Sequence, residues 1–184
     1  MSPALKRSLR LLLAVTLLLV AACSVAGTTR ALAYYRRAHQ YDHDGDYDRA
    51  IAYYDTTLTL FARPFSAEVF TDRGVAYYWK GMVPRAIADF DTALSIIPDE
   101  PRTLANRGAA YLELKQPRRA IVDLDAALRL KPAITWARHR RARAWAALDS
   151  VSRALADFDS VLATWKNRPD VVAERARLVA RVKH

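Results

Sequence analysis

The sequence predicts an all-α protein built from repeated helical hairpins, and three observations support this. Residues 67–100 hold two apolar-periodic segments, Ala67–Lys80 and Arg85–Ile97, separated by a helix breaker that contains Gly81 and Pro84. The same pattern recurs along the chain with a period of about 34 residues. The whole chain has only 5 glycines, too few for a turn-rich β fold. One hairpin alone exposes more apolar surface than it buries, so stacked copies are expected.

Length and composition favour a folded protein of ordinary size. The chain has 184 residues, of which 52% are hydrophobic and 26% are charged, so disorder is disfavoured. The formal net charge is +10. The single cysteine excludes an intramolecular disulfide and any zinc site built from several cysteines.

The N-terminus has the features of a secretory signal. Lys6, Arg7 and Arg10 precede an uncharged apolar run over positions 11–22. A membrane-spanning helix needs about 20 residues, so this run is too short to cross a bilayer comfortably. A basic segment before a short apolar run is typical of a signal peptide over residues 1–22. Cleavage there removes three basic residues and no acidic ones, which lowers the net charge to +7.

The segment Val20-Ala21-Ala22-Cys23-Ser24 resembles the lipobox of bacterial lipoproteins. The resemblance implies that Cys23 is lipidated and that residues 23–30 form a tether. Several acyl chains would then hold the protein firmly at a membrane. Ser24 stands where an aspartate often retains lipoproteins at the inner membrane, so the outer membrane facing the periplasm is favoured. A soluble secreted protein with an incidental Cys23, or an uncleaved anchor, stays an open alternative.

The repeats are expected at residues 31–66, 67–100, 101–134 and 135–168, and residues 169–184 read as one further helix that caps the array. Small residues fall where two helices must approach closely, such as Gly74, Gly108 and Ala142. Bulky residues such as Phe90 and Leu124 fill the space between the helices. Stacking buries a continuous apolar core, and terminal copies are expected to match less well.

This spacing of small, aromatic and proline residues resembles the tetratricopeptide repeat, or TPR. The resemblance covers roughly residues 31–184 and is strongest in residues 67–100. It implies a right-handed superhelix of about four hairpins plus the capping helix. With the lipobox, the whole chain resembles the TPR lipoproteins of the bacterial outer membrane.

In the family that the chain resembles, the first helix of each hairpin lines a concave groove that binds a partner. Carried onto this sequence, the groove is rich in aromatic residues and becomes basic toward its C-terminal end, and both kinds of side chain dominate binding hot spots. A solvated inner face without a ligand is the alternative. The candidate groove residues are Tyr35, His39, Asp72, Tyr78, Trp79, Asn106, Trp136, His139, Arg140 and Arg143.

Some TPR proteins grip the C-terminal carboxylate of a partner with five groove residues. Only Asn106 and Arg140 match that clamp, whereas Thr71, Val75 and Trp136 depart from it. This specific activity is therefore disfavoured. An Arg140/Arg143 patch remains suited to pairing with a carboxylate on a partner peptide.

Other chemistries have weaker support. The stretch Asp42–Asp48 is acidic, but an EF-hand loop of this register requires Gly and Glu where Tyr47 and Tyr53 stand. His39 and His43 share a helix face, but no metal motif of the HExxH kind occurs. No GxSxG motif is present either, and no cofactor is expected. The basic residues of 138–143 fall on different helix faces, which disfavours nucleic-acid binding.

The sequence thus predicts a non-enzymatic adaptor, tethered to a bacterial envelope membrane, that binds a partner protein or peptide in its groove. Two alternatives stay open. One is an envelope enzyme, and the other is a soluble secreted or self-associating structural protein. The oligomeric state is not predicted.

Overall fold

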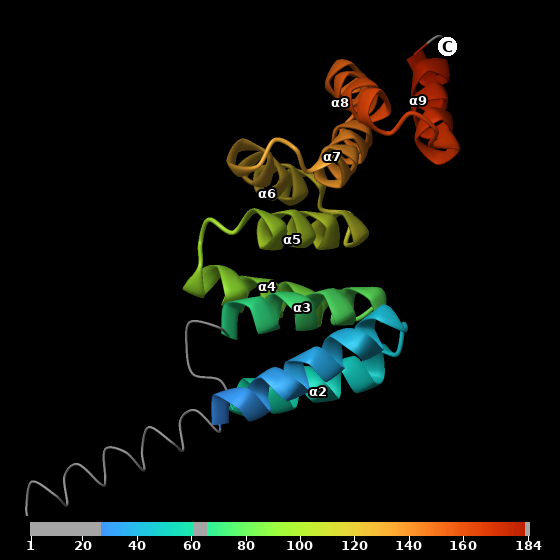
Figure 1. Ribbon diagram of the computed structural model, residues 1–184. Helices are drawn as coiled ribbons and strands as arrows, with labels where there is room; N and C mark the ends of the chain where they lie inside the picture. The colour runs from blue at the N-terminus through green and yellow to red at the C-terminus, as the bar shows by residue number, and fades with distance from the viewer. Residues whose placement is uncertain (1–26, 61–65, 183–184) are drawn as a thin grey trace, which may run out of the picture. The chain divides into compact units, whose positions relative to one another are not determined.

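The computed structural model describes residues 27–60 and 66–182, and within these ranges the chain is helical with no strand (Figure 1). The prediction of an all-α fold is therefore confirmed. The described residues fall into two compact units, with the division between Val69 and Phe70.

The first unit contains a helical hairpin. Residues 27–43 form one helix and α2 (Tyr47–Leu60) forms the other. The rings of Tyr41 and Tyr53 stack with centroids 5.3 Å apart, and Tyr54 is fully buried. Ala38 and Ala50 are also fully buried, and their small side chains allow the two helices to approach closely.

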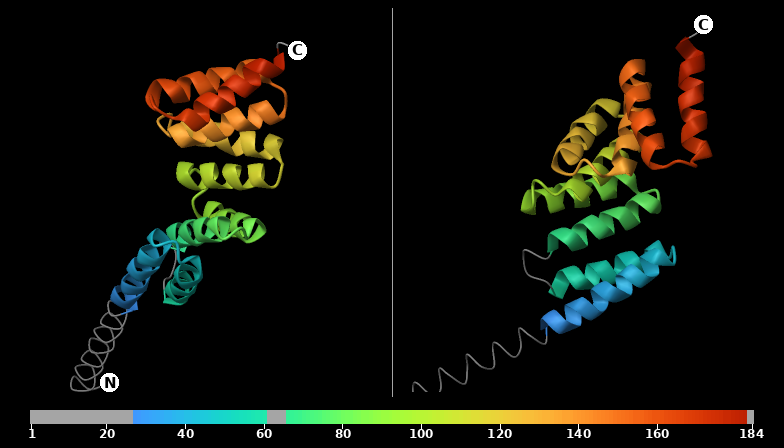
Figure 2. Two further views of the ribbon diagram at one scale, coloured as in Figure 1. Left: turned by 90° about the vertical axis from the view of Figure 1, so that its right-hand side faces the viewer. Right: turned by 45° about the horizontal axis from the view of Figure 1, so that its top comes forward.

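The second unit continues the pattern of paired helices. Neighbouring helices pack both within a hairpin, as α5 does on α6, and between hairpins, as α4 does on α5. Figure 2 shows the last two helices, α8 and α9, lying next to each other. Its helices are α3 (Ser66–Trp79), α4 (Val83–Ile96), α5 (Pro101–Glu113), α6 (Pro117–Leu130), α7 (Thr135–Ala147), α8 (Val151–Thr164) and α9 (Pro169–Val182). The first residues of α3 belong to the first unit.

Local sequence signals explain where the helices begin and turn. A proline occupies the first turn of α4, α5 and α6, where its missing N–H costs no intrahelical hydrogen bond. The Glu100 carboxylate accepts a hydrogen bond from the backbone N–H of Thr103 and so caps α5. The turns inside four successive hairpins each contain one residue with positive φ at the equivalent position: Gly45, Gly81, Lys115 and Asp149.

Close packing inside the α3/α4 and α5/α6 hairpins depends on glycine. A Cβ atom added to Gly74 in α3 would lie 2.6 Å from Cε1 of Phe90 in α4. One added to Gly108 in α5 would lie 2.8 Å from Cγ of Leu124 in α6. Phe90 and Leu124 are both fully buried, so neither side chain has free space into which to move.

A repeated set of ion pairs, which we call the arginine ladder, crosses the second unit. Its arginines are Arg73, Arg107, Arg141 and Arg175, each one repeat period after the last. Arg107 in α5 donates through Nε and Nη2 to both carboxylate oxygens of Asp123 in α6, each at 2.8 Å. It also donates through Nη1 to Asp91 in α4, at 2.7 Å. These hydrogen bonds raise the pKa of Arg107, and the one to Asp123 has the largest effect.

Candidate functional site

A cavity of about 330 Å³ opens within the second unit, and we call it the aromatic cavity. Three tryptophans contribute to its lining, and Trp79 is the most open of them, with 59% of its surface exposed. Six of the predicted groove residues line this cavity: Tyr78, Trp79, Asn106, Trp136, His139 and Arg140. The rest of its lining consists of Val75, Phe90, Ala109, Trp165 and Arg168.

The period of the repeat explains why these six residues meet. They lie on α3, α5 and α7, which are the first helices of three successive hairpins. Asn106 and Arg140 are separated by one repeat period and therefore occupy equivalent places on α5 and α7. Stacked repeats present equivalent positions on one continuous surface, so residues far apart in the sequence line one site.

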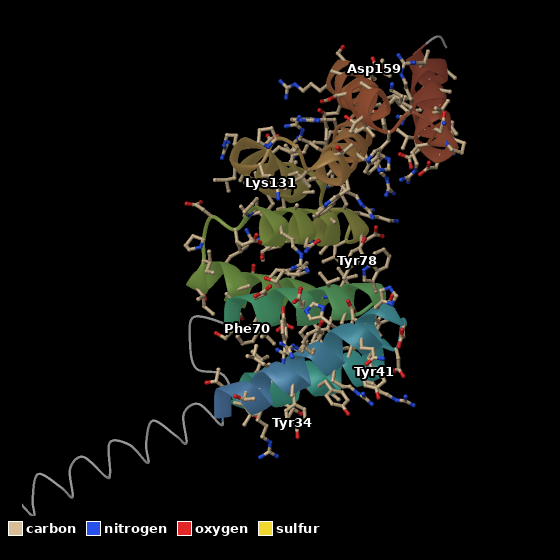
Figure 3. The ribbon with its side chains drawn as sticks, in the orientation of Figure 1. Tyr34, Tyr41, Phe70, Tyr78, Lys131 and Asp159 are labelled. Carbon is tan, nitrogen blue, oxygen red and sulfur yellow. The ribbon has the colours of Figure 1, made fainter. Side chains whose placement is uncertain are left out.

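Tyr78 and Arg140 meet at one carboxylate. The Tyr78 hydroxyl donates to Oε1 of Glu113 at 3.2 Å, and Nη1 of Arg140 lies 3.6 Å from the same oxygen. Figure 3 shows the Tyr78 side chain projecting from α3 toward α5. Burial raises the pKa of Tyr78, with the charge of Glu113 adding to the rise and that of Arg140 opposing it. Tyr78 is therefore a neutral hydrogen-bond donor at neutral pH.

His139 forms one wall of the aromatic cavity and is held by Glu174 of α9. Its Nε2 lies 2.9 Å from Oε2 of Glu174, and the histidine side chain is only 14% exposed. The ring of Phe158 lies 6.0 Å from the imidazole and that of Trp165 lies 6.4 Å from it. The hydrogen bond from His139 is the main cause that lowers the pKa of Glu174, so Glu174 is anionic at neutral pH.

Arg143 lies in a second cavity, of about 360 Å³, which we call the arginine pocket. Helices α7, α8 and α9 contribute to it. Arg181 in this pocket is ion-paired with Asp149. The pocket is lined by Arg143, Ala146, Phe158, Glu174, Arg177, Leu178 and Arg181.

The other predicted site residues lie elsewhere. Asp72 does not line the aromatic cavity; it is 2% exposed, and Arg102 of α5 forms an ion pair with its carboxylate. Tyr35 and His39 belong to the first unit, where their rings meet edge to face at 4.5 Å. Cys23 and the signal segment 1–22 lie outside the described residues.

Sequence reasoning missed Trp165 and Arg168, which follow α8 and line the aromatic cavity. The Arg168 guanidinium lies over the Trp165 ring at 4.8 Å and pairs with Asp170 at 2.7 Å. Both residues lie between α8 and α9, whereas the groove was assigned only to the first helices of the hairpins. The one signal in the sequence was a tryptophan at the place where earlier repeats carry Ile97 and Lys131.

Two family models match the chain. Residues 35–101 match one model of the tetratricopeptide repeat and residues 101–134 match another, so together they cover more than half of the 184 residues. The chain belongs to the TPR family. The helical hairpins of both units are thus TPR hairpins, and the first helices of three TPRs contribute the predicted residues of the aromatic cavity.

Solved structures similar to this TPR chain include two that concern peptides. The first TPR of Spaghetti (RPAP3) bound to the HSP90 peptide SRMEEVD has a TM-score of 0.62 and 27% identity, covering 64% of this chain and 94% of that one. YrrB, described as a TPR protein with an unusual peptide-binding site, has a TM-score of 0.68 and 24% identity, covering 83% and 78%. MamA from Desulfovibrio magneticus has a TM-score of 0.75 and 18% identity, covering 83% and 85%. No curated protein matches the sequence.

The described residues hold neither a metal-binding cluster nor a membrane-spanning helix. No group of three or more histidine, cysteine, aspartate or glutamate side chains is arranged to hold a metal ion there. Within the same residues, no helix combines the length and the apolar character that crossing a membrane requires.

Proposed function

We propose that this TPR protein is a non-enzymatic adaptor that binds a peptide segment of a partner protein in the aromatic cavity. The observation that carries the proposal is the meeting of six groove residues from three hairpins in one cavity of about 330 Å³. Indole rings and arginine are the side chains that contribute most to protein interfaces. A cavity lined by both offers an apolar site for a side chain and polar groups that orient the peptide.

The similar structures support a peptide as the ligand. The RPAP3 repeat, at 27% identity, holds an HSP90 peptide, and YrrB is described by its peptide-binding site. A shared fold does not specify the ligand, so the side chains of this cavity decide what it binds. They include neither the lysines nor the second asparagine of the carboxylate clamp, since Thr71, Val75 and Trp136 stand in those places.

A photo-crosslinking residue placed at Trp79 in the full chain tests the proposal. The matched control is the same residue at Val122 of α6, which is 67% exposed and does not line the aromatic cavity. In native membranes we expect the residue at position 79 to crosslink to a partner protein, and we expect no crosslink to that partner from position 122. An additional Asn106→Ala change should weaken the crosslinks at position 79 without lowering the melting temperature. The same set of crosslinks at both positions would contradict binding in the cavity.

We further propose that the adaptor is held at a bacterial envelope membrane, favouring the periplasmic face of the outer membrane. This part rests on the sequence of residues 1–24, with its basic start, short apolar run and Cys23. Mass spectrometry of the mature N-terminus should show an acylated Cys23. Replacing Cys23→Ala should move the protein from the membrane fraction to the soluble fraction. An unmodified Cys23 in a soluble native protein would rule out the lipid tether.

A further inference from the structure

The arginine pocket adjoins the aromatic cavity through one hydrogen bond. His139 lines the aromatic cavity, Glu174 lines the arginine pocket, and the two side chains are joined at 2.9 Å. Phe158 lines the arginine pocket, and its ring centroid lies 6.0 Å from that of His139. The two cavities are therefore neighbours, close enough for one short peptide segment to reach both.

Two guanidinium groups in the arginine pocket form no close ion pair with a carboxylate in the described part of the chain, although the charge of Arg143 acts on Glu174. Arg143 and Arg177 form no ion pair there, whereas Arg181 in the same pocket pairs with Asp149. The arginines of the ladder and Arg168 are likewise paired. Among the described residues, Glu174 is the only acidic one in the lining, and it is already hydrogen-bonded to His139. The pocket consequently carries an excess of positive charge.

We propose that the partner segment is acidic and binds the aromatic cavity and the arginine pocket at the same time. A bulky apolar or aromatic side chain enters the aromatic cavity, and an aspartate or glutamate a few residues away pairs with Arg143 and Arg177. Arginine binds carboxylates through two parallel hydrogen bonds, which gives this contact both strength and direction. This inference rests on the proposed peptide binding and adds the chemistry of the ligand.

The carboxylate in question belongs to an internal side chain. A free C-terminus would need the clamp residues, and Thr71 and Val75 stand where that clamp has a lysine and an asparagine. Neither Arg143 nor Arg177 occupies one of the five clamp positions, and Arg177 lies on α9, beyond the helices that carry those positions. A peptide with an amidated C-terminus is therefore expected to bind as well as the free acid.

Selection from a random peptide library displayed on phage tests the inference with the full chain in detergent. We expect enriched sequences to combine an aromatic or large aliphatic residue with an acidic residue at a fixed short distance. The enriched peptide is then synthesised in free-acid and amidated forms, and its binding is measured by fluorescence anisotropy. Its affinity should fall with rising salt, because exposed charges are screened.

Charge reversal supplies the decisive comparison. Arg143→Glu together with Arg177→Glu should weaken binding of the selected peptide by about tenfold or more, because the charge-assisted hydrogen bonds to its carboxylate are lost. The matched control reverses two exposed charges at the end of α6, Arg129→Glu and Lys131→Glu, which line neither cavity. Figure 3 labels Lys131 at this place. The control should leave the affinity unchanged, and both variants should melt near the wild type.

The outcomes separate the two proposals. If no peptide is selected, and if Trp136→Ala leaves the crosslinking of partners at position 79 unchanged, then the proposal of peptide binding is wrong. If peptides are selected without an acidic residue, or if both charge-reversed variants bind equally, peptide binding stands and the acidic preference is wrong. Binding to vesicles of phosphatidylglycerol that Arg143→Glu and Arg177→Glu abolish, with no effect on any peptide, would assign the arginine pocket to a lipid surface instead.

Discussion

Arg141 of α7 donates to both carboxylate oxygens of Asp157 in α8, through Nε at 2.8 Å and through Nη2 at 2.7 Å. Its remaining nitrogen, Nη1, donates to Asp125 of α6 at 2.7 Å. One guanidinium therefore joins the two helices of its own hairpin and also joins that hairpin to the one before. Arg107 repeats the arrangement one hairpin earlier with Asp123 and Asp91. These pairs supplement the apolar stacking that stabilises the array.

Replacing Arg107→Met should destabilise the protein. Asp123 is only 4% exposed, and without Arg107 its charge stays buried and uncompensated. The pair is partly open to solvent, so we expect a loss of about 3 kcal/mol, at the low end for a buried ion pair. Urea denaturation checks this value. Adding Asp123→Leu should recover part of the loss, and an equal loss in the single and double variants would contradict the explanation.

The last arginine of the ladder provides a contrast. Arg175 of α9 pairs with Asp159 through exposed side chains, 38% and 55% accessible, and no following helix in the described chain offers a second carboxylate. Arg175→Met should therefore change the stability very little, because exposed ion pairs are weakened by water and salt. The same urea series measures it beside Arg107→Met. A comparable loss in both variants would mean that burial does not set the strength of these pairs.

Replacing Gly74→Leu should destabilise the second unit by about 1–3 kcal/mol or more through overpacking. Its Cβ alone would lie 2.6 Å from the Phe90 ring and 3.2 Å from the backbone oxygen of Ala86. Gly27→Leu is the matched control, because a Cβ at Gly27 meets nothing within 4 Å. Thermal melts of the two variants check the prediction. A Gly74→Leu variant that melts with the wild type would refute the close packing of α3 on α4.

Replacing Lys115→Gly should stabilise the protein by about 1 kcal/mol, because Lys115 has a φ of 56° that is costly for a residue with a side chain. The expected rise in melting temperature is about 2–4 °C for a chain of this size. Asp149→Gly at a φ of 54° relieves less strain, because aspartate tolerates the left-handed region better than lysine does, and its exposed ion pair with Arg181 adds little. It should therefore stabilise less than Lys115→Gly, and calorimetry that ranks them the other way would contradict this account.

Replacing His139→Phe should raise the pKa of Glu174 toward its ordinary value, because the hydrogen bond from His139 is the largest cause of its depression. Arg143→Leu should raise it less, since that residue acts only through its charge. Because its pKa is lower in the folded chain than in the unfolded chain, ionised Glu174 stabilises the fold. This contribution is complete at pH values above the unfolded-state pKa, and it is lost as the pH falls through the folded-state pKa. Carboxyl NMR titration measures each pKa, and an unchanged value in His139→Phe would rule out the hydrogen bond.

The all-helical fold could be predicted because each hairpin repeats its small and bulky residues at one constant spacing, as Gly74 and Gly108 do. The inner positions of α3, α5 and α7 came from the resemblance to TPR proteins, and six of the residues assigned to them line one cavity. Asp72 was expected at the groove surface, but it is buried beside Arg102 of the next hairpin, a contact that no local pattern encodes. Trp165 and Arg168 were missed because the groove was assigned only to the first helices of the hairpins, whereas both residues lie between α8 and α9.

The arginine ladder was visible in the sequence, since its arginines and aspartates share the spacing of the repeat. Apolar periodicity predicts the helices and the core, but it does not predict ion pairs. Arg107 and Asp123 are charged and lie 16 residues apart. Charges at such a distance meet only when two helices of a hairpin are antiparallel. Knowledge of the hairpin therefore had to come before the ion pairs could be recognised.

The two-sided bonding of Arg107 and Arg141 makes each hairpin a module with matching ends. A hairpin carries an aspartate for the arginine of the next module and an arginine for the aspartate of the previous one. Duplicating or deleting a segment of one repeat period within 101–168 would therefore leave no remaining arginine of the ladder without a carboxylate. Gene rearrangements in whole modules can lengthen or shorten this array, while shifts by any other length separate its charges.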